Sequence, residues 1–90
     1  MEQKAKALIA WTPAGGDTAR RMGEKYLAAG VEIIFHGRAE REELIFLGKR
    51  ENVTHVLYFL DHKKLLLVSL ADEMGGFTVE ILVEDLVLPG

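Results

Sequence analysis

Four short apolar runs, separated by longer segments with the character of helices, most constrain what this chain can fold into. The runs are AKALIAW, VEIIF, VTHVLYFL and FTVEILV, at residues 5–11, 31–35, 53–60 and 77–83. Each is too short for a typical helix, and most are rich in β-branched or aromatic residues, as β-strands are. The sequence therefore predicts a sheet of four strands.

The segments between these runs predict three helices. The first is capped by Asp17 or Thr18, shows one apolar face, and stops at Gly30. The second covers residues 38–51, which are charged around three apolar positions. The third covers residues 62–74, HKKLLLVSLADEM, and ends at a pair of glycines.

Helical connections between successive strands imply parallel pairing and right-handed crossovers. The predicted fold class is therefore α/β: a small, doubly wound, flavodoxin-like three-layer domain. Its four-stranded parallel sheet would have the order 2-1-3-4, with the first helix on one face and the other two helices on the opposite face. Ninety residues leave room for a single domain, residues 1–90.

Composition and charge exclude several classes of function. With 49% hydrophobic and 28% charged residues the chain is globular rather than disordered. A net charge of −3 argues against duplex nucleic acid as a partner, because binding phosphates needs clustered positive charge. No apolar stretch approaches the roughly 18 residues of a membrane helix, so no membrane partner is expected. The absence of cysteine excludes a disulfide and a thiolate zinc site, and it fits a cytoplasmic location.

In a doubly wound sheet, ligands bind beyond the carboxyl ends of the strands, where the strand order reverses. That point would lie between the first and third strands. The loop after the first strand has two glycines, which allow close backbone approach, and it leads to a helix N-terminus that attracts anions. The predicted binding residues are Thr12, Gly15, Gly16, Asp17, Thr18, Asp61, His62, Glu84 and Asp85.

Several interpretations of this site remain open. A phosphate could bind at the glycines, but the loop matches neither G-x-G-x-x-G nor a Walker motif, and a tight turn leading to an aspartate cap is the favoured interpretation. A hard cation could bind the carboxylates. However, the acidic pair that follows the first strand in receiver domains is absent. No nucleophile and base stand at a motif spacing, so no catalytic residue and no metal ligand is assigned.

Residues 6–37, KALIAWTPAGGDTARRMGEKYLAAGVEIIFHG, combine a strand, a glycine–aspartate loop, a helix with an early glycine, an AAG stop and a second strand. With this pattern, which continues to the end of the fourth strand, the chain resembles the cobalamin-binding domain of methylmalonyl-CoA mutase and related mutases and methyltransferases. The resemblance implies the doubly wound fold and a cofactor pocket at the same place.

The residues that hold the cofactor in that family are replaced here. The family's D-x-H-x-x-G motif supplies the cobalt ligand, and Arg20 or Ala19 stands at its histidine, depending on the register. The S-x-L after the third strand is replaced by Leu60-Asp61-His62, and the glycine pair after the fourth by Glu84-Asp85. The family's fifth strand and last helix are missing. The cofactor is therefore unknown, and cobalamin bound through histidine is disfavoured.

These observations predict a non-catalytic ligand-binding or protein-interaction module, resembling a degenerate cobalamin-binding domain. One alternative is a genuine small cofactor binder, which holds cobalamin base-on or a nucleotide. Another is a metal-dependent enzyme that uses the acidic residues of the site.

A homodimer is the expected assembly, besides a small-molecule ligand or a larger protein partner. Three helices would leave part of one sheet face uncovered, and the tail LVLPG adds apolar residues 86–88 that nothing in the chain obviously covers. The dimer would form across that face or through the tail, since exposed apolar surface usually marks an interface. A monomer whose tail folds back over its own sheet is the alternative.

Overall fold

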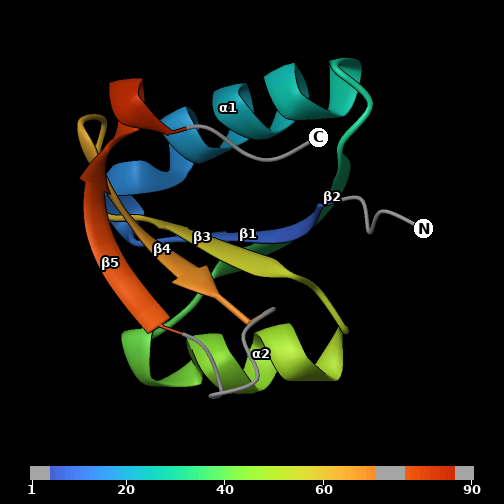
Figure 1. Ribbon diagram of the computed structural model, residues 1–90. Helices are drawn as coiled ribbons and strands as arrows, with labels where there is room; N and C mark the ends of the chain where they lie inside the picture. Colours follow the sequence, from blue (N-terminus) through green and yellow to red (C-terminus); the bar gives the residue numbers. More distant parts are fainter. Residues whose placement is uncertain (1–4, 71–76, 87–90) are drawn as a thin grey trace.

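The computed structural model describes residues 5–70 and 77–86, in which one five-stranded sheet lies between two helices (Figure 1). The strands are β1 (Lys6–Trp11), β2 (Glu32–Arg38), β3 (His55–Phe59), β4 (Lys64–Ser69) and β5 (Phe77–Leu82). The helices are α1 (Gly16–Ala28) and α2 (Leu44–Arg50). The short 3-10 helices are η1 (Pro13–Gly15), η2 (Arg41–Glu43) and η3 (Val83–Asp85).

The sheet is mixed and has the order β2-β1-β3-β4-β5. Strand β1 pairs in parallel with β2 and β3, whereas β4 is antiparallel to both of its neighbours. Strand β4 therefore runs against the other four. The carboxyl ends of β1, β2, β3 and β5 consequently lie along one edge, which we call the carboxyl edge.

The predicted fold class is wrong in the second half of the chain. Residues 62–74 were predicted as a third helix, but they contain β4, and residues 71–74 lie outside the described residues. The described part therefore has two helices and a mixed sheet, not a four-stranded, all-parallel, flavodoxin-like sheet of order 2-1-3-4 with three helices. The cause is burial on both faces. Leu65 packs on the α1 side and Leu66 on the α2 side, so an uninterrupted apolar run was mistaken for a buried helix.

Each face of the sheet has its own core, because alternate strand residues point to opposite faces. On the α1 side the buried residues are Ala7, Ile9, Ala19, Leu57, Phe59, Leu65 and Leu86. On the α2 side they are Leu8, Ala10, Leu44, Leu47, Val53, Val56, Tyr58, Leu66 and Val68. The central strands are buried on both faces, which explains their continuous apolar sequences.

In the first half of the chain the structure agrees more closely with the prediction from the sequence. Helix α1 ends at Ala28, and Gly30 has a φ of 93°, the left-handed conformation expected at its stop. The predicted cap is wrong, because Gly15 precedes α1 without a side-chain cap and Asp17 lies in the first turn. Helix α2 is shorter than the predicted helix over 38–51, since β2 continues to residue 38 and η2 precedes α2. No helix of the described residues is long and apolar enough to cross a membrane.

The last described residues fold back over the α1 side of the sheet. Leu86 is 7% exposed within that core, and its carbonyl oxygen accepts a 3.0 Å hydrogen bond from Tyr26 Oη. The expectation that the chain cannot cover its tail is therefore wrong for Leu86. Residues 87 and 88 lie outside the described residues. Leu86 is consequently not free to cover a second copy of the chain.

Candidate functional site

The ends of β1 and β3 are joined at the carboxyl edge, where the sequence placed the site. The backbone N–H of Thr12 donates a 3.0 Å hydrogen bond to the carbonyl oxygen of Phe59. Its side chain also donates, from Oγ1 to the carbonyl oxygen of Leu60 at 2.6 Å. The Thr12 hydroxyl proton is thus already used in a hydrogen bond within the chain and is not available to a ligand.

The two glycines of the loop pack against the chain's own residues. A Cβ at Gly15 would lie 2.1 Å from the carbonyl oxygen of Phe59, which is too close for any side chain. A Cβ at Gly16 would lie 3.1 Å from Nε1 of Trp11. These glycines do allow a close approach, as predicted. The groups that approach them are parts of the chain itself, namely the backbone of β3 and the indole of Trp11, and not a ligand.

The two residues that follow lie in the first turn of α1. Asp17 is exposed, while Thr18 is only 3% exposed, so its hydroxyl is not open to a ligand. A helix N-terminus attracts anions, and an aspartate there already interacts favourably with the helix dipole. Asp17 thus occupies the position that an anionic ligand would need.

Asp61 closes the tight turn between β3 and β4. Its Oδ1 accepts hydrogen bonds from the backbone N–H groups of Lys63, at 2.7 Å, and Lys64, at 2.9 Å. These two bonds stabilise the carboxylate and hold the pKa of Asp61 below its ordinary value of 3.8. Asp61 is therefore a turn residue and not the cap of a third helix.

Asp61→Asn should destabilise the fold at neutral pH, and the difference should close in acid. Because the pKa of Asp61 is lowered in the folded state, its charge stabilises the fold above the unfolded pKa, and this contribution is lost as pH falls through the folded pKa. Urea unfolding of both proteins from about pH 7 to about pH 2 measures the gap in free energy of unfolding. A gap that stays constant over this range contradicts the charged turn.

His62 and Glu84 meet in a hollow at the far end of the carboxyl edge. It has a volume of about 480 Å³ and is lined by His62, Lys63, Leu82, Val83 and Glu84. A backbone hydrogen bond joins the two segments that line it, because Val83 N donates to the carbonyl oxygen of Lys63 at 2.7 Å. Asp85 is exposed in η3 and does not line it. Within the described residues, no three His, Asp or Glu side chains converge as a metal site would require.

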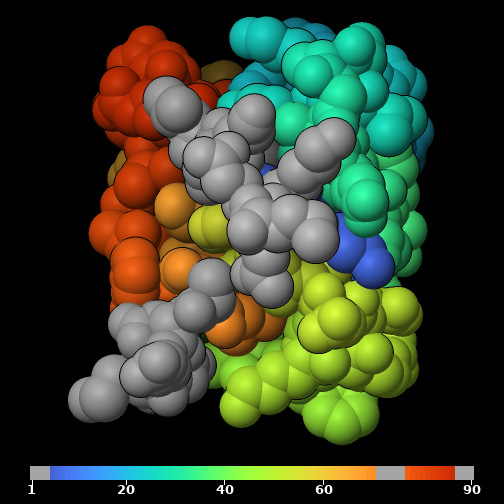
Figure 2. Space-filling view, turned by 45° about the vertical axis from the view of Figure 1, so that its right-hand side comes forward, coloured from blue at the N-terminus to red at the C-terminus, as the bar shows by residue number. Residues whose placement is uncertain are grey.

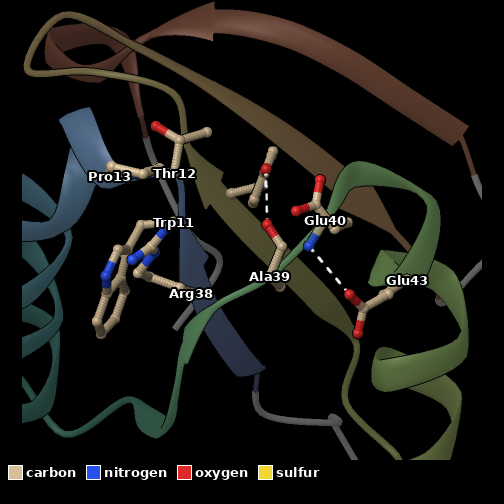
Figure 3. Close-up of a pocket in the computed structure, with 8 residues that line it drawn as sticks. Trp11, Thr12, Pro13, Arg38, Ala39, Glu40 and Glu43 are labelled. Carbon is tan, nitrogen blue, oxygen red and sulfur yellow. Dashed lines mark hydrogen bonds between the residues drawn. The ribbon is translucent and has the colours of Figure 1, made fainter.

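A different pocket lies on the other side of Thr12, where β1 and β2 end (Figure 3). We call it the rim pocket, and its volume is about 450 Å³. Its walls come from three strand ends, from the β2–η2 connection and from η2. The lining residues are Trp11, Thr12, Pro13, Arg38, Ala39, Glu40, Glu43 and Tyr58. Of the residues predicted from the sequence, only Thr12 belongs to it.

Opposite charges stand at the two ends of the rim pocket. Arg38 is paired with Trp11 in the β1–β2 ladder, and Figure 3 shows its side chain beside the indole. The guanidinium carbon of Arg20 also lies 5.9 Å from the centre of that ring, within the range of a cation–π contact. Glu40 and Glu43 occupy the other end, where Glu43 Oε1 accepts a 3.2 Å hydrogen bond from Glu40 N.

Tyr58 holds the connection between these two ends in place. Its hydroxyl donates a 2.8 Å hydrogen bond to the carbonyl oxygen of Ala39, which separates Arg38 from Glu40 in the sequence. Burial raises the pKa of Tyr58, and the charge of nearby Glu40 raises it further. The phenol therefore stays protonated, and a donor, at neutral pH.

Most of this pocket was not predicted from the sequence, for one reason. The second strand was predicted to end at residue 35, and Arg38, Glu40 and Glu43 were assigned to a helix, where charges usually form a solvated face. In the structure β2 continues past an irregularity in its pairing with β1, next to Gly37, which has a φ of 115°. A glycine that follows the apolar run after one histidine, at Gly37, was the available signal for a strand with a bulge.

No model of a known protein family matches the chain, and no curated protein matches it either. The resemblance to cobalamin-binding domains therefore stays a prediction. The antiparallel strands β4 and β5 differ from the all-parallel sheet which that resemblance implied.

Proposed function

We propose that the chain is a non-catalytic binding module that holds a small dipolar molecule in the rim pocket. The observation that carries this proposal is the separation of charge in the pocket, with Arg38 at one end and Glu40 and Glu43 at the other. A ligand with an anionic group near Arg38 and a cationic group near Glu40 would make a charge-assisted contact at each end.

Polar groups form the larger part of the pocket wall, and the apolar part is smaller. The indole of Trp11 lies beside Arg38 and packs mainly against the α1-side core. Ala39 and Pro13 add small apolar surfaces. This wall suits a small polar ligand with a short apolar spacer between its charged groups.

Binding is favoured over catalysis by what the hydroxyl groups of the pocket already do. Thr12 Oγ1 donates to the carbonyl oxygen of Leu60 and Tyr58 Oη to that of Ala39, so both hydroxyls serve as structural donors. The acidic residues that the sequence suggested for the metal site of an enzyme lie outside this pocket. Asp61, one of them, accepts hydrogen bonds from the backbone of its own turn. Among the described residues, no specific contact favours the cobalamin or nucleotide alternative.

The single tryptophan of the chain lies in this pocket, so its fluorescence reports binding there directly. The probe is 5-aminopentanoate, because its carboxylate and ammonium group stand at opposite ends of a short aliphatic chain. We expect it to change Trp11 fluorescence in a saturable way. The matched compounds pentanoate and pentylamine, which each lack one charge, should bind roughly tenfold more weakly. If either one bound as well as 5-aminopentanoate, the two-ended recognition proposed here would be wrong.

Two variants separate the contributions of the ends. Arg38→Gln should weaken the binding of 5-aminopentanoate and pentanoate but not that of pentylamine. Glu40→Gln should weaken the binding of 5-aminopentanoate and pentylamine but not that of pentanoate. Arg21→Gln is the matched control, since Arg21 is exposed on α1 and lies outside the pocket. Affinities unchanged in both pocket variants would contradict the proposal.

A further inference from the structure

Strand β5 is an edge strand whose outer side pairs with no other described strand. Its atoms, orange to red, form one flank of the molecule in Figure 2. Three of its apolar side chains are well exposed, namely Phe77 at 55%, Val79 at 40% and Leu82 at 41%. An unpaired edge with apolar side chains is a ready template for pairing with another chain.

This edge has few of the features that usually prevent such pairing. Its sequence, FTVEIL, contains neither proline nor lysine, its one charged residue is Glu80, and its pairing with β4 shows no bulge. The opposite edge, β2, differs: its pairing shifts register between Ile9 and Ala10, and charged residues stand at both of its ends, Glu32 and Arg38. Of the two edges, β5 is therefore the one suited to association.

One hydrogen bond identifies which backbone groups of β5 point away from β4. Val83 N donates to the carbonyl oxygen of Lys63, and residues along an antiparallel pair alternate between bonded and non-bonded positions. Residues 77, 79 and 81 therefore direct their backbone groups at β4. The backbone groups of Thr78, Glu80 and Leu82 point away from the sheet and are available to a further strand.

We propose that β5 pairs with β5 of a second copy of this chain, antiparallel about a two-fold axis that passes through Val79. Thr78 of each copy then lies opposite Glu80 of the other, and their outward backbone groups form the hydrogen bonds between the two strands. The side chains on the α1 side also match, because Val79 faces Val79 and Phe77 faces Ile81. The two sheets become one continuous sheet.

Charge disfavours the neighbouring register that is centred on Glu80. A shift of two residues would put the axis at Glu80 and set two carboxylates directly opposite each other, which is unfavourable. A shift of one residue would pair the apolar face of one copy with the more polar face of the other. The homodimer expected from the sequence thus forms through a strand edge, and not through a sheet face or the tail.

Single cysteines test the register, because the chain has none of its own. Val79→Cys places two cysteines opposite each other at the axis, where Cα atoms are about 4.5 Å apart, within the range of a disulfide. Mild oxidation should link this variant into a dimer. Thr78→Cys should link far less, because its two cysteines would be two positions out of register, and this exposed position leaves Glu80 in place. Equal or stronger linking of Thr78→Cys would put the axis at Thr78 and overturn the proposal.

Sedimentation equilibrium of the unmodified chain tests the dimer itself. At high micromolar concentration we expect a species of twice the 10.0 kDa mass of the chain. Val79→Lys should raise the dissociation constant roughly tenfold or more, because two lysines would face each other at the axis. Phe46→Lys, at an exposed position of α2, should leave it unchanged. A chain that is monomeric throughout, or a dimer insensitive to Val79→Lys, would overturn the proposal. If Val79→Lys does not fold, the cysteine variants decide.

Discussion

Replacing Gly15 with alanine should lower the free energy of unfolding by about 3 kcal/mol. The added Cβ would lie 2.1 Å from the carbonyl oxygen of Phe59 and 2.7 Å from its carbonyl carbon. Both are backbone atoms, and the same oxygen accepts the hydrogen bond from Thr12 N that joins β1 to β3. Relief of the contact therefore requires η1 to move away from the sheet or this hydrogen bond to break. Urea unfolding followed by circular dichroism measures the change.

Ala14→Ser is the matched control, because Ala14 lies in the same 3-10 turn but is exposed. Its effect should stay within about 0.5 kcal/mol of zero, as is usual for surface positions. If Gly15→Ala were equally harmless, the loop would not pack against β3 as described. A loss of ligand binding with full stability would instead favour the cofactor loop that the sequence suggested.

The first half of the fold could be predicted because its local signals agree with one another. Strand β1 is an apolar run, α1 has a single apolar face, and Gly30 stops the helix in a conformation that glycine adopts readily. A strand, a helix and a second strand in this order have one common arrangement, which is a parallel pair. The position of the carboxyl edge follows from that pairing.

The second half could not be predicted, because one side-chain pattern serves two structures. An aspartate that caps a helix accepts hydrogen bonds from backbone N–H groups two or three residues later. Asp61 does the same in a tight turn, accepting from Lys63 and Lys64. The local sequence DHKK is thus consistent with both. The apolar run that follows does not resolve the choice, since a strand buried on both faces has no alternation.

The place of the candidate site was predicted only as an edge of the sheet and not residue by residue. Topology placed it between the ends of β1 and β3, whereas the rim pocket lies beside that point, where β1 and β2 end, and includes only Thr12 of the predicted residues. The charged residues of the pocket depend instead on where β2 ends and how η2 turns. These details are fixed by tertiary contacts, such as the hydrogen bond from Tyr58 to Ala39, and such contacts have no signature in the local sequence.

Leu65→Ala and Leu66→Ala should each lower the free energy of unfolding by about 2–5 kcal/mol. The two residues are neighbours in β4, yet they lie in different cores: Leu65 is fully buried on the α1 side, and Leu66 is 4% exposed on the α2 side. Each truncation leaves a cavity between the sheet and the elements that cover that face. Two large losses at adjacent positions are what a strand covered on both faces requires.

Lys64→Ala provides the control, because Lys64 is exposed at the start of the same strand and should change the free energy of unfolding by no more than about 0.5 kcal/mol. Leu67→Ala should fall between the control and the two buried leucines, since Leu67 is only partly buried. The pattern across the four positions distinguishes the two structures proposed for this segment. On the surface of a sheet, an amphipathic helix buries one stripe of residues and exposes the rest. A large loss for Leu65→Ala together with a negligible loss for Leu66→Ala would therefore favour the helix and contradict β4.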